Sequence, residues 1–113
     1  MPVLDTKDLP VLEKRPGWRG RLFHSPSLTF VHWDFEAGSD IHEHSHEQEE
    51  VWEILLGELE VTIGGKAHVA GAGMVAIIPA HARHSVKALT DGKAIVIDYP
   101  LRPDFDAPPS SVL

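Results

Sequence analysis

Residues 42–57 have the sequence HEHSHEQEEVWEILLG, in which closely spaced histidines and glutamates lead into an apolar run that ends in glycine. In a β-strand, residues two apart lie on the same face, so we expect His42, His44 and His46 to point the same way. Glu50 then shares a face with three large apolar side chains, those of Trp52, Ile54 and Leu56. An unpaired buried charge is costly, so an inward carboxylate needs a partner. A divalent cation held by the histidines would be the simplest one.

A second histidine group, His81-Ala-Arg-His84, lies further along the chain. His84 shares a strand face with Val86 and Ala88, so it also points toward small or apolar neighbours. Three imidazoles and one carboxylate would leave one or two positions open on a metal, where a substrate or dioxygen can bind. The alternative is a solvated acidic surface or a weak adventitious metal site. His42 is either a further ligand or a group at the pocket mouth that faces the substrate.

Short apolar runs broken by Gly, Pro and Asp extend along the chain after Leu22. Residues 27–36 (SLTFVHWDFE) are rich in aromatic and β-branched types, which favour strands, but the pattern leaves open which face of this strand is inside. The Asp91-Gly92 pair favours a hairpin. About eight short strands with a turn roughly every 8–12 residues predict an all-β sandwich or barrel. The other expected strands are 50–57, 58–65, 66–69, 74–79, 84–89 and 93–100.

The length of 113 residues indicates one domain. We expect an irregular or edge-strand lead-in over 1–19, which contains three prolines and Gly17, a barrel over 20–100, and a Pro- and Ser-rich tail over 101–113. A homodimer is predicted, because a monomer would leave the outward apolar residues exposed to solvent. These residues are Val51, Leu55, Ile95 and Ile97.

The composition excludes several kinds of partner. Ten Lys and Arg against 17 Asp and Glu give a net charge of −7, which opposes binding to nucleic acid or to an anionic membrane. The chain contains no cysteine, so neither disulfides nor thiolate chemistry is expected. The first residues show no signal-peptide pattern, and no apolar stretch approaches a membrane span. These features predict a cytoplasmic protein.

The spacing of residues 38–57 resembles the first cupin motif. The matching positions are Gly38, His44, His46, Glu50 and Gly57. Residues 73–88 resemble the second motif through Gly73, Pro79 and His84, with two departures: His81 stands where glycine is usual, and Ala88 where asparagine is usual.

The resemblance implies a small single-domain cupin, an all-β double-stranded β-helix or jelly roll. It implies one divalent transition metal (Fe, Mn, Ni, Zn or Cu) on His44, His46, Glu50 and His84. It also implies a homodimer. His81 would add an imidazole near the pocket rim, and Trp52 would form a pocket wall.

Residues 96–105 (VIDYPLRPDF) resemble the closing segment of small cupins that act on 4,5-unsaturated uronic acids from pectin and alginate. The matching residue types are Asp98, Tyr99 and Arg102, which would line the pocket. Two departures weaken the match: the spacing to Arg102 is shorter, and Glu50 stands where that family tends to have glutamine. The alternative is a last strand that ends in a proline-bounded tail. Asp98 and His42 are the candidate proton carriers.

The cupin fold supports many activities, so the fold does not fix the function. The favoured hypothesis is a metal-dependent enzyme acting on a small organic molecule, with either dioxygenase-like or isomerase- or cyclase-like chemistry. The alternative is a non-catalytic cupin that binds a sugar or an effector. We interpret His24 and His68 as surface histidines, and Arg83 as an exposed cation.

Overall fold

A computed structural model of the protein describes residues 3–103, which form ten β-strands and one short 3-10 helix, η1 (Thr6–Asp8). The first five strands are β1 (Leu12–Arg15), β2 (Trp18–His24), β3 (Thr29–Phe35), β4 (Asp40–His44) and β5 (Glu49–Leu56). The others are β6 (Glu58–Ile63), β7 (Lys66–Gly71), β8 (Val75–Ile78), β9 (His84–Ala88) and β10 (Gly92–Tyr99).

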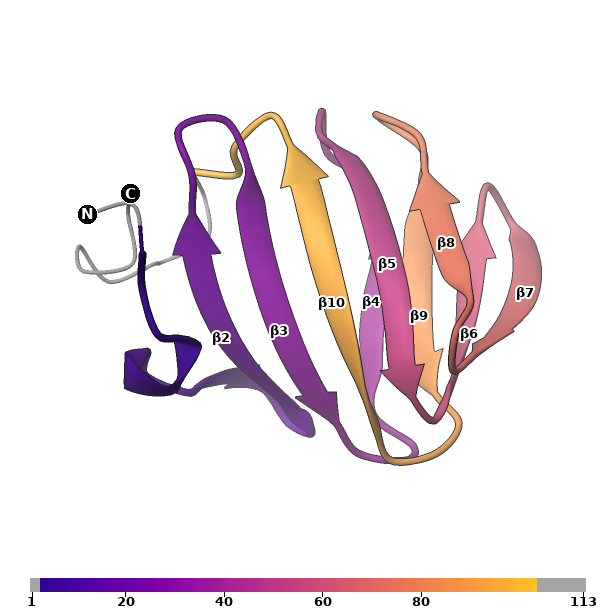
Figure 1. Ribbon diagram of the computed structural model, residues 1–113. Coiled ribbons are helices and arrows are strands. Elements are labelled where there is room, and N and C mark those ends of the chain that lie inside the picture. Colours follow the sequence, from indigo (N-terminus) through magenta and orange to yellow (C-terminus); the bar gives the residue numbers. More distant parts are fainter. Residues whose placement is uncertain (1–2, 104–113) are drawn as a thin grey trace.

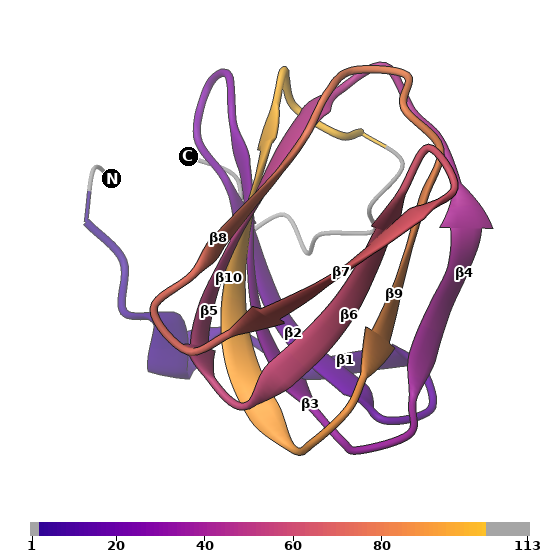
Figure 2. The ribbon, with the colours of Figure 1, turned by 90° about the vertical axis from the view of Figure 1, so that its right-hand side faces the viewer.

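The strands form two antiparallel sheets that face each other (Figure 1). The larger sheet has the order β1-β2-β3-β10-β5-β8, and the smaller has the order β4-β9-β6-β7. Figure 2 shows the two sheets as opposite walls of a barrel. The expected all-β jelly roll is confirmed.

The core lies between the sheets because apolar residues alternate along the strands. In β9, His84, Val86 and Ala88 are buried, as their period-two spacing predicts. Leu59 and Val61 of β6 are completely buried opposite this strand. Burying an aliphatic side chain of this size contributes about 1.5–3 kcal/mol to the free energy of folding. Burial of these alternating residues therefore stabilises the packing of the two sheets.

An aromatic cluster fills the part of the core beneath β2 and β3. Trp18 is completely buried and lies 5.6, 5.4 and 5.9 Å, between ring centroids, from Trp33, Phe35 and Trp52 respectively. The odd-numbered residues of β3 therefore face inward, which the sequence pattern left open. Two members of this cluster, Trp33 and Trp52, also line the cavity described below.

Two predicted side-chain positions are wrong. His24 is buried rather than on the surface, because it ends the inward face of β2, and its Nδ1 lies 2.7 Å from Thr29 Oγ1. Leu56 is 55% exposed rather than inward. The register between β5 and β10 shifts at Lys93 and Ala94, and this bulge ends the inward alternation after Ile54.

The hairpin predicted at Asp91-Gly92 is also wrong, because β9 and β10 lie in different sheets. The segment instead carries the chain across the end of the barrel. Gly92 packs so closely that an added Cβ would overlap the carbonyl oxygen of Leu56 and lie 2.5 Å from Phe35 Cζ. Asp91 Oδ1 accepts a 2.9 Å hydrogen bond from Ala37 N, which ties this crossing to the loop before β4.

The lead-in over 1–19 contains an edge strand, β1, which pairs with β2 in the larger sheet. Of the tail expected over 101–113, only residues 101–103 lie within the described part. No helix among the described residues has the length and apolar character that a membrane crossing requires.

Candidate metal centre

Three histidines from three segments meet inside the barrel. His44 ends β4, His84 opens β9 directly opposite it in the register, and His46 lies in the loop that follows β4. The ring centroids of His44 and His84 are 4.2 Å apart, and those of His46 and His84 are 4.9 Å apart. One nitrogen from each ring lies within 4.8 Å of the others, so a single ion can contact all three.

The backbone orients each of these imidazole rings. Nδ1 lies 2.8 Å from His42 O in His44, 3.1 Å from Gln48 O in His46, and 2.9 Å from Ala82 O in His84. A carbonyl oxygen can only accept, so each Nδ1 carries the proton and each neutral ring keeps a lone pair on Nε2. Metal-binding histidines usually donate their other N–H in this way.

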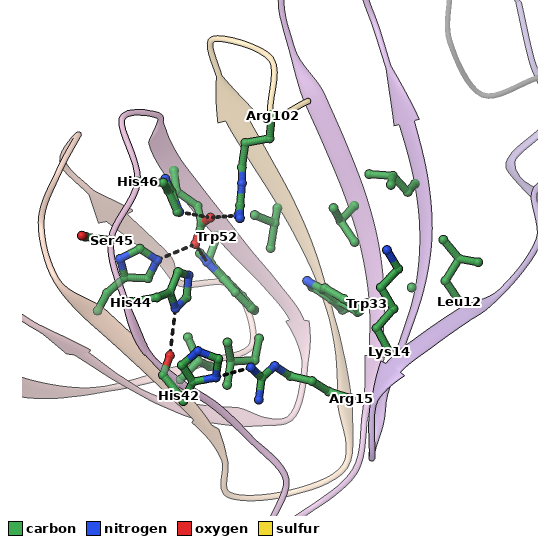
Figure 3. A pocket seen from close by; sticks show the side chains of 18 residues that line it. Leu12, Lys14, Arg15, Trp33, His42, His44, Ser45, His46, Trp52 and Arg102 are labelled. Carbon is green, nitrogen blue, oxygen red and sulfur yellow. Dashed lines mark hydrogen bonds and ion pairs between the residues drawn. The ribbon is translucent and has the colours of Figure 1, made fainter. Parts of the chain in front are cut away.

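Glu50 brings a buried carboxylate to the same point. Its Oε1 lies 3.2 Å from His46 Nε2 and its Oε2 lies 3.4 Å from His84 Nε2. Trp52 Nε1 donates a 2.6 Å hydrogen bond to Oε2, which fixes the carboxylate plane (Figure 3). Both of these Nε2 atoms are buried, and neither has an aligned hydrogen-bond partner among the described residues. Buried polar atoms are rarely left in this state, and a shared cation accounts for both, so the donor set fits a divalent metal.

The pKa shifts of Glu50 and His44 agree with this fit. Burial raises the pKa of Glu50, but His46 and His84, then Asp98 and Trp52, outweigh it and hold the pKa well below its usual range. Burial lowers the pKa of His44. Burial also lowers the pKa of His84, and the Glu50 carboxylate more than reverses this. Glu50 is therefore ionised at neutral pH, which is the form that binds a metal ion.

Asp98 lies directly behind Glu50, as its cross-strand neighbour on β10. It is completely buried, and Arg102 Nη1 lies 3.5 Å from Asp98 Oδ2 and 3.6 Å from Glu50 Oε1. Burial, followed by the charge of Glu50, raises the pKa of Asp98 to about 9. The segment that carries Arg102 is held by hydrogen bonds from Arg102 N to Thr29 Oγ1 and from Gln48 Nε2 to Leu101 O, at 2.9 and 3.2 Å.

A cavity of about 440 Å³ opens onto these groups, a size that suits one small molecule. His44, His46 and Arg102 lie toward one end (Figure 3), and Glu50 and His84 also line the cavity. The remaining walls are largely apolar, and β1 closes the opposite side. These other lining residues are Leu12, Lys14, Arg15, Gly20, Leu22, Val31, Trp33, Ile41, His42, Ser45, Trp52, Val86 and Val96.

The cupin domain family model matches residues 31–100, which include every one of the four candidate ligands. The chain belongs to the cupin family. No match was found among curated proteins. The solved structures similar to this cupin include an RmlC-like cupin from Shewanella frigidimarina NCIMB 400, with 24% identity and a TM-score of 0.86 over 93% of this chain and 96% of that chain.

Two further solved structures share this cupin fold. KdgF from Halomonas sp. has 24% identity and a TM-score of 0.84, with 92% of this chain and 97% of that chain covered. A predicted oxalate decarboxylase from Thermotoga maritima has 22% identity and a TM-score of 0.75, with 88% and 99% covered. At these identities the likeness concerns the fold alone.

The structure brings three of the other predicted site residues to the cavity of this cupin. Trp52 and Arg102 line it, and His42 lines it near the rim, where the Arg15 guanidinium is hydrogen-bonded to His42 Nδ1. Asp98 does not reach the cavity wall, because Glu50 and Arg102 lie in front of it. Its role as a proton carrier stays a prediction, and any such role would act through these two side chains.

Two predicted pocket residues lie outside the cavity. Tyr99 is 54% exposed, because it follows the inward Asp98 and so points to the outer face of β10. His81 is exposed and adopts a left-handed backbone with φ of 68°, where the motif usually has glycine. Its N–H donates a 2.8 Å hydrogen bond to His46 O, so the turn supports a ligand through the backbone.

The sequence analysis missed the wall made by β1 and by Trp33. The segment interpreted as a lead-in contributes three residues to the cavity wall: Leu12, Lys14 and Arg15. One signal could have pointed to this wall: Gly20 interrupts the apolar face of β2, and a glycine inside a strand often marks a close approach.

Proposed function

We propose that this cupin is a metal-dependent enzyme that acts on a small organic molecule. One divalent transition metal (Fe, Mn, Ni, Zn or Cu) would be held by His44, His46, Glu50 and His84. The observation that carries the proposal is the pair of buried Nε2 atoms, in His46 and His84, that have no aligned hydrogen-bond partner within residues 3–103 and belong to two residues that line the cavity. Donors that converge there but leave space beside them are typical of a catalytic site rather than a structural one.

The metal, when bound, would polarise an oxygen atom of the substrate. Glu50 would serve as a ligand and not as the proton carrier, because a bound cation keeps a carboxylate ionised. Arg102 faces the cavity beside the ligands, so its guanidinium is placed to stabilise negative charge that develops on the substrate. Asp98 would position Arg102, whose Nη1 lies 3.5 Å from Asp98 Oδ2.

His42 is the proposed proton carrier that faces the cavity directly. Its side chain lines the wall, and the Arg15 guanidinium donates to its Nδ1, which leaves the proton of the neutral ring on Nε2. This arrangement favours isomerase- or cyclase-like proton transfer.

Two other functions retain a specific supporting observation. The apolar walls around Leu22, Val31 and Val96 are of the kind that suits oxygen chemistry at a redox metal. The same cavity would equally hold a ligand without any reaction, as in a non-catalytic cupin that binds a sugar or an effector. The cytoplasmic location and the absence of nucleic-acid and membrane partners stay predictions from charge and sequence.

Elemental analysis of protein purified without added metal tests the main proposal. We expect close to one divalent transition-metal ion per chain, because four preorganised donors converge on one point. The same protein is then assayed for oxygen uptake with a panel of small organic acids. Turnover without oxygen uptake would support proton transfer, and uptake would favour the oxidative reaction. Metal content near zero after reconstitution with all five candidate metals would contradict the proposal.

We also propose that the protein is a homodimer that associates through the outer face of the larger sheet. A row of apolar residues crosses five neighbouring strands of this face in register: Phe23, Phe30, Ile97, Val51 and Ile77. Ile77 is 61% exposed, and Val75 beside it is 55% exposed. A continuous apolar surface of this kind is typical of an interaction site.

Sedimentation velocity is expected to give a dimer at micromolar concentration for the wild type. Ile77→Glu is expected to give a monomer, because it places a charge at the most exposed end of the apolar row. Val69→Glu is the matched control, since Val69 is 54% exposed on β7 of the other sheet. A wild-type monomer, or a dimer that both variants retain, would contradict the proposed interface.

A further inference from the structure

The cationic side chains around the cavity already have partners, so its ligand needs no charge of its own to satisfy them. The Arg15 guanidinium is hydrogen-bonded to His42. Arg102 Nη1 lies 3.5 Å from Asp98 Oδ2, and Lys14 also takes part in an interaction. Away from the proposed metal, the cavity therefore offers a ligand mainly its apolar walls.

Apolar side chains on these walls keep surface that the protein does not cover. On β3 the inward residues Val31 and Phe35 are buried, whereas Trp33, which points the same way, is only partly buried. Ile41 of β4 and Leu12 of β1 also line the cavity and are only partly buried. Removing such apolar surface from water is favourable. The body of the ligand should therefore be apolar.

The Trp33 indole is held in place by two neighbours. Gly20 is its register partner on β2, and a Cβ built on Gly20 would lie 2.7 Å from Cζ3 and 2.9 Å from Cε3 of the indole. The ring therefore occupies space that only a glycine leaves. Trp18 packs edge-on against it, with ring centroids 5.6 Å apart and an interplanar angle of 82°. The indole is thus preorganised, which lowers the cost of ordering it around a ligand.

The smaller sheet supplies an aliphatic wall on the other side of the cavity. Ile41 and Val86 are register partners on β4 and β9, and both line the cavity. Figure 3 shows Trp33 between Trp52 and Lys14, away from the histidines. A ring bound between the two sheets would contact the indole on one side and aliphatic groups on the other. An aromatic ring gains more from an indole than its buried area alone provides, because the two rings attract each other through their quadrupoles.

We infer that the ligand of this cavity carries a neutral aromatic ring that packs against the Trp33 indole. An oxygen on a substituent of the ring reaches the metal end, and this half of the inference alone rests on the proposed function. The aromatic contact depends on β2 and β3, which contribute none of the four candidate metal ligands. Gly20 determines the specificity with Trp33, because a side chain there would push the indole into the cavity.

Calorimetric titration with two neutral probes tests the aromatic contact. One probe is 2-naphthylmethanol, and the other is its fully hydrogenated analogue, which keeps the carbon skeleton and the hydroxyl but has no aromatic ring. The hydrogenated probe is the more apolar, so a wall that was merely apolar would favour it. We expect the wild type to bind the aromatic probe about threefold to tenfold more tightly, as for the extra attraction within an aromatic pair.

Variants of the wall assign this preference to its source. Trp33→Leu should abolish the preference, because it keeps an apolar side chain and removes the ring, and Trp33→Phe should reduce it. Gly20→Ala should weaken the binding of both probes, since the added methyl would displace the indole. Phe30→Leu is the matched control: it removes a ring from the same strand at a position that does not line the cavity, and it should keep the wild-type preference.

Equal binding of the probes, tighter binding of the hydrogenated one, or no binding of either would overturn the inference. An unchanged preference in Trp33→Leu would also overturn it, and if melting curves show that this variant is unfolded, an unchanged preference in Trp33→Phe has the same meaning. Titrations of metal-stripped and metal-loaded protein separate the two proposals. If the protein takes up no metal but still prefers the aromatic probe, the proposed function fails and the aromatic site stands. Metal uptake without any preference would give the reverse result.

Discussion

His84→Ala is expected to reduce metal affinity by at least about 100-fold, and to leave the purified protein with far less than one metal ion per chain. Loss of a residue that merely orients a ligand already costs about 10–100-fold, so loss of the ligand itself should reach or exceed that range. His84 is also almost completely buried, and its Nε2 lies 3.4 Å from Glu50 Oε2 within the candidate site. Elemental analysis and metal titration of the stripped protein give the result.

His68→Ala is the control for this experiment, because His68 is exposed on β7 and does not line the cavity. It should retain the wild-type metal content. His84→Ala removes buried volume as well as a ligand, so melting curves must accompany the metal measurement. The decisive variant is His44→Ala/His84→Ala: if it remains folded and its metal content equals that of the wild type, the metal site is not where we place it.

Gly92→Ala is expected to lower the free energy of unfolding by about 3 kcal/mol, near the upper end of the usual cost of overpacking. The added methyl would collide with the main-chain oxygen of Leu56 and with the Phe35 ring. Neither can move freely, because Leu56 ends β5 and Phe35 packs on Trp18 in the aromatic cluster. For a domain of this size the loss corresponds to a fall of roughly 10 °C in Tm.

Gly71→Ala provides the comparison, since it makes the same chemical change at the end of another strand. A Cβ there would meet Glu58 Cγ at 3.7 Å, an ordinary van der Waals distance. We expect its stability to stay within about 0.5 kcal/mol of the wild type. Chemical denaturation of the wild type, Gly92→Ala and Gly71→Ala measures the three free energies of unfolding. Equal denaturation midpoints for the two variants would show that the crossing into β10 tolerates a side chain.

The inward faces of β5 and β9 were predictable because they depend on local geometry. Period-two alternation places the residues of one strand face together, so His84 could be matched with Val86, and Glu50 with Trp52, from the sequence alone. The same rule failed at Leu56, where a shift of register against β10 breaks the alternation. A bulge depends on the partner strand, and the local sequence does not contain that partner.

The remaining errors also arise from long-range pairing. Asp91-Gly92 carries a turn signal, but the signal does not say whether the next strand returns to the same sheet or crosses to the other. Likewise, the position of β1 over the cavity depends on its pairing with β2 at the sheet edge. Lys14 and Arg15 therefore looked like ordinary residues of a lead-in, although they line the cavity.

The three carbonyl-anchored imidazoles determine how the proposed metal would be acquired. Each ring has already lost its rotational freedom to a main-chain acceptor within the barrel, so loading requires little further ordering. In zinc fingers, capture of the ion and folding of the chain are a single event. In this cupin they would be separate, and the folded apoprotein would act as a rigid receptor in exchange with the ions around it. Nitrogen and oxygen donors accept several divalent ions, so the ion found in a purified sample records the supply in the cell as well as the preference of the site.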